Sequence, residues 1–191
     1  MPLTTWAELR WALVGCLRLA RGDRGGLAYF DRSLDGFWRS FLSAVLAYPC
    51  FLILLTMRVS LADWDSVGGL PIVLIETIGY ITLWVAFPLV MLSVLRWIGR
   101  EDRFFDFMVP YNWCQLPQGV LFVCVGVEAV TGALSDTVSQ AIEIAAFIAV
   151  LVYEWFIARV ALETSGAAAA MVVLVDVVLL ELVTSTAGSL Y

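Results

Sequence analysis

Histidine and lysine are absent from this sequence, and charged residues of any kind are few. All eleven basic residues among the 191 are arginine, and 15% of the chain is charged. The absence of histidine excludes Ser-His-Asp and Cys-His catalysis, histidine metal sites and histidine haem ligation. We therefore expect a protein that is not an enzyme, with no catalytic residue, bound metal or cofactor.

Cysteine is scarce, and nucleotide-binding motifs are missing. Cys16, Cys50, Cys114 and Cys124 form no C-x-x-C pair, so their spacing indicates structural thiols rather than a redox or metal site. The sequence contains no P-loop and no H-E-x-x-H segment. ATP hydrolysis and zincin chemistry therefore have no support.

Apolar residues are abundant. They make up 62% of the chain, and the mean hydropathy is +0.92, well above the average for soluble proteins. The charges cluster between long apolar runs, as expected where a charge at the bilayer centre is costly. The net charge of -6 does not indicate nucleic-acid binding, because the arginines lie mostly on one side of the expected spans. We expect an integral membrane protein in contact with the lipid bilayer.

Five apolar runs are long enough to cross a bilayer, since each meets the requirement of about 20 residues. They cover residues 37–57, 71–98, 107–130, 139–162 and 166–187. The sequence thus predicts an all-α fold, a polytopic transmembrane bundle of about five spans. We divide the chain into a cytoplasmic segment at 1–36 and a five-span domain at 37–191.

The cytoplasmic segment is expected to begin with an amphipathic helix at the membrane interface. Thr5 and Glu8 have the spacing of a capping box. Apolar residues then recur at helical spacing, namely Trp6, Leu9, Leu13, Leu17 and Ala20. Such a stripe, with arginines elsewhere around the helix, is typical of a helix that lies in the headgroup layer.

The arginines also predict the orientation of the chain, because translocated loops contain few basic residues. The segment up to Arg39 carries six arginines, and the opposite loops carry only Arg58. Four more lie on the amino-terminal side: Arg96, Arg100, Arg103 and Arg159. We expect a cytoplasmic amino terminus and a periplasmic carboxyl terminus, and the use of arginine alone favours a bacterial inner membrane.

Two carboxylates are expected near the middle of the membrane. Asp176 lies ten residues beyond Gly166, at about 1.5 Å per residue. Glu154 has a similar depth in the preceding antiparallel span, so the two are expected to meet, or to pair with Arg159. Glu181 should face another direction. The alternatives are a structural contact between helices, a proton or ion pathway, and contact with a partner subunit.

Three further acids, Glu76, Glu128 and Glu143, fall near the far-side ends of their spans. Water is within reach there, which favours ordinary interfacial polar residues. The alternative is an acidic outer vestibule for cations.

A polar face is expected where the third span begins. Asn112, Gln115 and Gln118 recur every three residues around Pro110 and Pro117, and two prolines free backbone carbonyls. The pattern predicts a broken helix that lines a substrate site, or a kink whose amides hold neighbouring helices together. The sequence leaves both open.

The five spans and two segments of sequence resemble the bacterial branch of the Yip domain family, membrane proteins related to Ypt-interacting proteins. The segments are Phe-Asp-Arg-Ser-Leu-Asp-Gly-Phe-Trp-Arg-Ser-Phe at 30–41 and Val-Pro-Tyr-Asn-Trp at 109–113. The Asp-Leu-Tyr-Gly-Pro signature of members in nucleated cells is missing, so Rab binding is not carried over. The resemblance implies a membrane organiser or accessory subunit without enzyme activity.

The sequence therefore supports two functions. The first is a non-catalytic organiser or adaptor that contacts lipid, other membrane proteins or a second copy through residues 1–40. The alternative is a small secondary transporter or proton-coupled channel that uses Glu154, Asp176, Arg159 and the polar face of the third span. Deletion of residues 1–21 is expected to weaken partner recruitment without loss of insertion.

Overall fold

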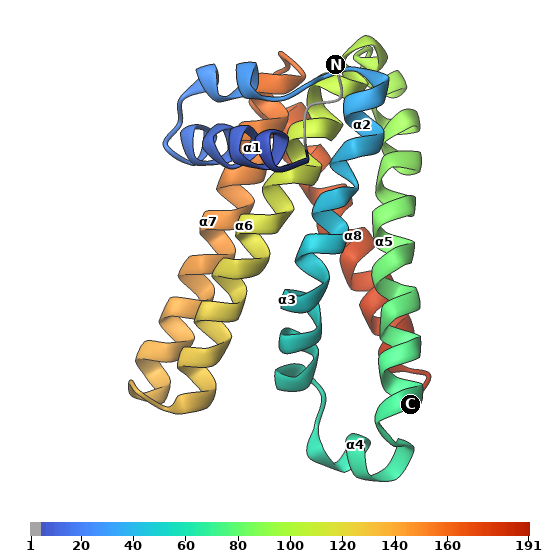
Figure 1. Cartoon of the computed structure of the whole chain (residues 1–191), viewed down its shortest axis with the longest axis vertical. Helices are drawn as coiled ribbons and strands as arrows, with labels where there is room; N and C mark the ends of the chain where they lie inside the picture. Colours follow the sequence, from blue (N-terminus) through green and yellow to red (C-terminus); the bar gives the residue numbers. More distant parts are fainter. Residues whose placement is uncertain (1–4) are drawn as a thin grey trace.

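The computed structural model describes residues 5–191, and within this range it contains helices and no strand, as the sequence predicts (Figure 1). In chain order the helices are α1 Thr5–Ala20, η1 Arg24–Tyr29, α2 Leu34–Ser40, α3 Leu42–Arg58, α4 Leu61–Val67, α5 Gly69–Trp97, η2 Glu101–Arg103, α6 Phe104–Thr131, α7 Asp136–Ala161 and α8 Gly166–Gly188. The predicted all-α class is confirmed.

Five helical segments are long and apolar enough to cross a membrane, so the chain is a multi-pass membrane protein. They are Leu34–Arg58, Gly69–Trp97, Glu101–Thr131, Asp136–Ala161 and Gly166–Gly188. The predicted limits of the last four spans lie within three residues of the ends of α5, α6, α7 and α8. The short helix α4, between the first two spans, was not predicted.

The first span is interrupted at Phe41, where α2 ends and α3 begins. The Ser40 hydroxyl donates to the carbonyl of Phe37 at 2.7 Å, and the Ser43 hydroxyl donates to the carbonyl of Ser40 at 2.5 Å. Serine hydroxyls that bond the preceding turn compete with the helical ladder and bend helices. The predicted first span at 37–57 lies within the segment Leu34–Arg58, and it consists of two helices that meet at Phe41.

Helix α6 is continuous through both of its prolines, so of the two alternatives left open by the sequence, the broken helix is wrong. Pro110 and Pro117 lie inside a single helix of 28 residues. Within a bilayer an opened backbone has no water to bond, which favours continuing the helix over breaking it. Asn112, Gln115 and Gln118 therefore lie on one continuous helix.

Helix α1 lies across α6 and α7 at one end of the bundle, which we call the α1 end (Figure 1). Its buried face carries Ala12, Cys16 and Leu19. The predicted apolar stripe is largely outside this face, because Leu13 and Leu17 are 40% and 53% exposed. An interfacial helix places apolar residues against both lipid and protein, so its hydrophobic pattern does not distinguish these two faces.

The side chains that pack most tightly gather at the α1 end. One hydrophobic core there joins Leu19 of α1 to Met91 of α5, Phe107 of α6 and Ile157 of α7. Residues from 1–36 and from 37–191 thus share one core. The opposite end, which we call the α4 end, has a smaller cluster around Leu55, Val59 and Ile72. Between these clusters the five spanning helices surround a cavity.

Candidate functional site: an intramembrane cavity with two facing carboxylates

The cavity has a volume of about 630 Å³ and is lined by α3, α5, α6, α7 and α8. It exists because α8 leaves α7 to join α5. Near the α1 end the Trp155 indole donates to the carbonyl of Gly166 at 2.9 Å. From there α7 and α8 diverge, and Gly79 of α5 lies against Val183 and Ala187 of α8 (Figure 1). The volume is typical of a site for a small organic molecule.

Glu154 and Asp176 face each other at the inner end of the cavity. Glu154 is 6% exposed and Asp176 is partly buried. The side-chain amide of Gln115 donates to Glu154 at 3.4 Å, and the Tyr111 hydroxyl faces Asp176. The structure thus brings together the two acids that the sequence places at equal depth.

The predicted polar face of α6 lines the same cavity. Asn112, Gln115 and Gln118 all contribute to its wall. Asn112 donates its side-chain amide to the Ser40 hydroxyl at 2.8 Å, which fixes α6 against the bend in the first span. The amide nitrogen of Gln118 is buried and has no hydrogen-bond partner among the described residues. A buried donor of this kind is costly and is available to a ligand.

Two other residues of the predicted site lie elsewhere. Arg159 is exposed and its guanidinium stands 5.1 Å from the centre of the Trp155 ring. It does not form the predicted pair with Glu154 or Asp176, because the cation–π contact holds it on the outer surface. Glu181 is exposed on α8 and does not line the cavity. The polar site therefore consists of the two carboxylates and the amides of α6.

A buried ion pair lies at the outer end of the cavity. Arg58 contacts Glu76 at 2.5 Å, and Glu76 is 2% exposed. The Tyr191 hydroxyl donates to the other oxygen of Glu76 at 2.7 Å. Burial and this hydrogen bond raise the pKa of Tyr191 to about 12, so its hydroxyl keeps the proton that it donates. Arg58, the exception to the arginine distribution, thus neutralises a buried acid.

Of the three acids near the α4 end, Glu76 and Glu143 line the cavity and Glu128 does not. Glu128 accepts a hydrogen bond from Ser139 at 3.1 Å and lies between α6 and α7. Glu143 is exposed and lines the cavity, as does Phe147, which is 45% exposed. Leu180 of α8 also lines the cavity and is 46% exposed. The cavity is therefore open sideways between α7 and α8, and Glu143 stands at this opening.

Comparison with known proteins assigns no family to the chain. No protein family, curated protein or solved structure matches it. The function is therefore argued from the cavity and its residues.

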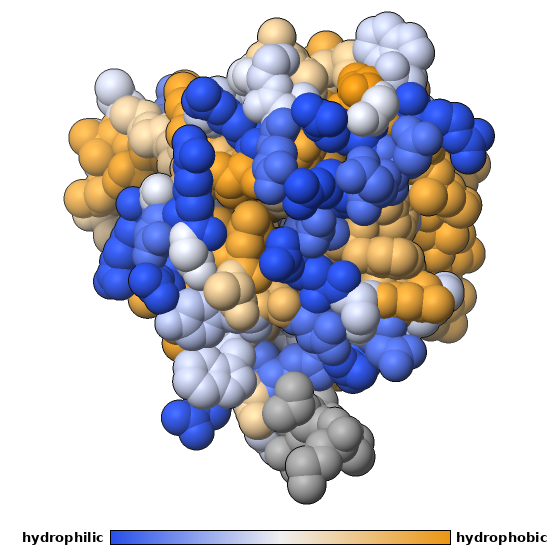
Figure 2. Space-filling view, turned by 90° about the horizontal axis from the view of Figure 1, so that it is seen from above, coloured by the Kyte–Doolittle hydropathy of each residue, from blue (hydrophilic) through white to orange (hydrophobic). Residues whose placement is uncertain are grey.

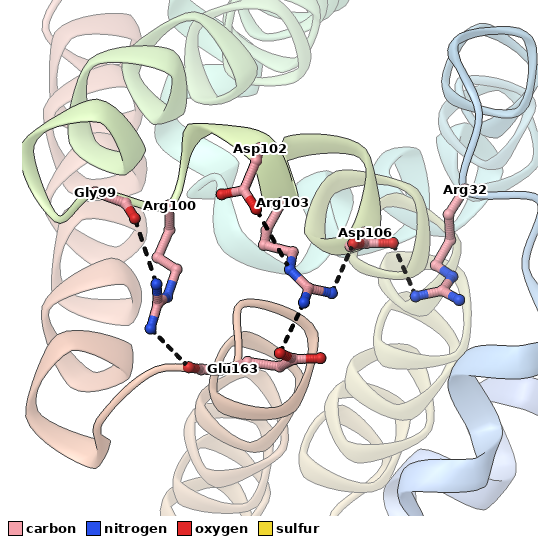
Figure 3. Close-up of polar contacts among 7 residues, drawn as sticks. All are labelled: Arg32, Gly99, Arg100, Asp102, Arg103, Asp106 and Glu163. Carbon is pink, nitrogen blue, oxygen red and sulfur yellow. Dashed lines mark hydrogen bonds and ion pairs between the residues drawn. The ribbon is translucent and has the colours of Figure 1, made fainter.

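The α1 end is closed above the cavity by a polar network that the sequence did not predict. Arg103 contacts Asp106 at 3.2 Å and Glu163 at 2.7 Å, and Arg32 contacts Asp106 at 2.8 Å (Figure 3). Arg100 donates to the carbonyl of Glu163 at 3.2 Å. The hydrophilic face in Figure 2 belongs to this end. The network joins the loops before α2, α6 and α8, so this end is held together.

Two cysteines from distant parts of the chain meet between α1 and α6. The sulfur atoms of Cys16 and Cys114 are 3.2 Å apart, and both residues are buried. The Tyr153 hydroxyl lies 2.9 Å from the carbonyl oxygen of Cys16 and 2.9 Å from the Cys114 sulfur. These contacts fix α1 on the bundle. Cys50, in contrast, lines the cavity.

Proposed function

We propose that this chain is a small secondary transporter that binds its substrate in the cavity and exchanges it for a proton held by Glu154 and Asp176. The observation that carries the proposal is the carboxyl pair at the closed end of a cavity that is open near its other end. Intramembrane acids that face a cavity mark proton and ion pathways in membrane proteins. From the sequence alone, a transporter was the alternative to the membrane organiser.

The carboxyl pair is suited to hold a single proton. Two adjacent carboxylates in a medium of low dielectric resist ionising together, so their protons leave in two separate steps. Among the described residues, the other titratable side chains close to the pair are Tyr111 and Cys114 of α6, and neither is basic. A bound cation or a proton would supply the missing positive charge, which couples the two.

Exchange across a membrane requires access from each side in turn. The structure is open between α7 and α8 toward the α4 end. Toward the α1 end, the core around Met91, Phe107 and Ile157 closes the path. We infer a second state in which this core separates, and the network around Arg103 opposes that separation.

We infer that the α1 end faces the cytoplasm of a bacterial cell and that the carboxyl terminus is periplasmic. Arg32, from the loop before α2, meets Arg100 and Arg103, from the loop before α6, at this end (Figure 3). An excess of arginine marks the cytoplasmic side of inner-membrane proteins. The open side of the cavity then faces the outer leaflet.

Labelling of Cys50 tests the proposal without a known substrate. Cys50 lines the cavity, Cys16 and Cys114 are buried, and Cys124 is removed by Cys124→Ala. We expect the rate of labelling by a charged methanethiosulfonate to report how open the cavity is. This rate should change several-fold between about pH 5.5 and about pH 8.5, because protonation of the pair shifts the population of states.

The thiol itself reacts faster as the pH rises, so each rate is divided by that of a Glu154→Gln/Asp176→Asn variant at the same pH. This ratio removes the pH dependence of the thiol reaction itself. What remains is the pH dependence of labelling that arises from Glu154 and Asp176. A ratio that stays constant with pH would contradict the proposal.

The first function predicted from the sequence was a non-catalytic organiser, and one observation supports it. Trp6, Trp11 and Leu17 of α1 are 75%, 54% and 53% exposed, so α1 presents an apolar surface to lipid or to another membrane protein. Membership of the Yip family, which implies such a role, stays a prediction. The two functions differ in what they require of α1.

Deletion of residues 1–21 is expected to destabilise the whole bundle. It removes Ala12, Cys16 and Leu19 from the core that α1 shares with α5, α6 and α7. Loss of buried apolar groups leaves a cavity and lowers the free energy of unfolding. Thermal melting in detergent should show a large fall for the deletion and little change for Trp6→Ala, which removes an exposed side chain. An unchanged melting temperature would make α1 a detachable contact surface, as the organiser requires.

A further inference from the structure

We propose that the substrate of the cavity is an organic cation with an aromatic or otherwise bulky apolar body. This inference rests on the transporter function proposed above and names its substrate class. It combines the charge of the cavity wall, the aromatic rings along it and the position of its opening.

The charge of the wall is negative. The cavity is lined by four acids, Glu76, Glu143, Glu154 and Asp176, and by one basic residue, Arg58. Arg58 is bound to Glu76, so three acids have no basic partner within the lining. An anionic substrate would be repelled here, and a neutral substrate would leave these negative charges without a positive partner. A single positive charge beside Glu154 and Asp176 would give these carboxylates the ionic partner that they lack.

The remainder of the wall argues for an organic rather than an inorganic cation. Most lining residues are apolar, among them Leu54, Leu83 and Val150. A small inorganic ion would lose its hydration in such surroundings and requires several oxygen ligands in return. Among residues 5–191 no group of three or more His, Cys, Asp or Glu side chains could hold a metal ion. A large cation with a dispersed charge loses far less hydration and gains contact with the apolar wall.

Aromatic rings occupy one face of α5 along the path from the outer to the inner end. Tyr80, Trp84 and Phe87 recur at helical spacing and all line the cavity. The ring centres of Tyr80 and Trp84 are 6.1 Å apart, and Phe51 of α3 lies 4.7 Å from Tyr80. Phe87 stacks on Tyr111 at 4.4 Å, next to the carboxyl pair. Ring faces attract cations, and tryptophan does so most strongly.

The opening suits a substrate that dissolves in lipid. It lies between α7 and α8, within the membrane-spanning segments, where Glu143 and the exposed Phe147 line the cavity from α7 and the exposed Leu180 lines it from α8. Amphipathic cations partition into bilayers with their charge near the headgroups. Such a molecule enters sideways, with Glu143 as the first acid on its path and Glu154 and Asp176 as the last.

Equilibrium dialysis with two probes of the same shape tests this substrate class. Tetraphenylphosphonium and tetraphenylborate differ in the sign of their charge and match in size and aromatic surface. We expect purified protein in detergent to bind tetraphenylphosphonium at least tenfold more tightly than tetraphenylborate, after subtraction of protein-free micelles. Glu154→Gln/Asp176→Asn should remove this preference. Glu181→Gln should keep it, because Glu181 lies on α8 outside the cavity.

A second variant keeps the test valid if the double charge variant does not fold. Trp84→Leu keeps the apolar volume and all four acids, and it should weaken tetraphenylphosphonium binding by about threefold, the usual size of a cation–π contact. Equal binding of both probes by the wild-type protein would overturn the cation class. That result would leave the pH dependence of Cys50 labelling intact, so the substrate class and the transporter proposal fail separately.

Discussion

Asp176→Asn is expected to abolish the pH-driven flux of an aromatic cation while the protein remains folded. In proteoliposomes with entrapped DNA, ethidium entry is followed by its fluorescence. An imposed pH gradient should change the wild-type rate on the order of tenfold or more, in the range usual for coupled sites. With Asp176→Asn the rate should be the same with and without the gradient. Asparagine keeps polar contacts near Tyr111 but carries no exchangeable proton.

The expected loss follows from the way the two acids share their surroundings. Glu154 retains the hydrogen bond from Gln115, but without Asp176 no second carboxylate competes for the proton. The protonation of Glu154 then no longer depends on a partner, and substrate binding no longer displaces a proton.

Glu181→Gln is the matched control for this experiment. Glu181 lies on the same helix five residues further along, and it is exposed outside the cavity. The substitution removes the same charge from α8 and should leave both flux and melting temperature unchanged. Normal gradient-driven flux in Asp176→Asn would remove the central residue of the proposed mechanism.

The proximity of Glu154 and Asp176 was predictable because it depends only on the length of the turn between their helices and on the helical rise per residue. The turn between α7 and α8 is short, from Leu162 to Ser165, so the helices return antiparallel in a fixed register. Depth in the membrane is then about 1.5 Å per residue counted from the turn. Composition and length predicted the spans for the same reason, since both depend on the thickness of the bilayer.

The features that were missed depend on the rotation of helices about their axes. Lipid and protein are both apolar, so the hydrophobic pattern indicated neither the buried face of α1 nor the outward direction of Arg159. Arg58 and Glu76 pair across two helices. Their contact depends on how these helices are rotated relative to each other, and no local sequence pattern predicts that rotation. The unbroken course of α6 through Pro110 and Pro117 follows from the solvent, because a bilayer penalises an opened backbone.

Arg58→Gln is expected to be the most destabilising single substitution at the outer end of the cavity. It leaves Glu76, which is 2% exposed, with the Tyr191 hydrogen bond and without its cation. Breaking a buried ion pair costs about 3–5 kcal/mol, and the 45% exposure of the Arg58 side chain favours the lower value. For a chain of this size that corresponds to a fall in melting temperature of about 6–12 °C.

The double substitution Arg58→Gln/Glu76→Gln separates charge from packing. If the cost arises from an unpaired buried carboxylate, removing Glu76 as well should restore most of the lost stability, because neutral amides bury more cheaply than one charge. The non-additivity measured in the cycle of single and double variants then gives the coupling between the two side chains. A double variant as unstable as Arg58→Gln alone would instead mean that Arg58 acts through its aliphatic stem. Glu76 would then no longer count among the charges that shape the cavity.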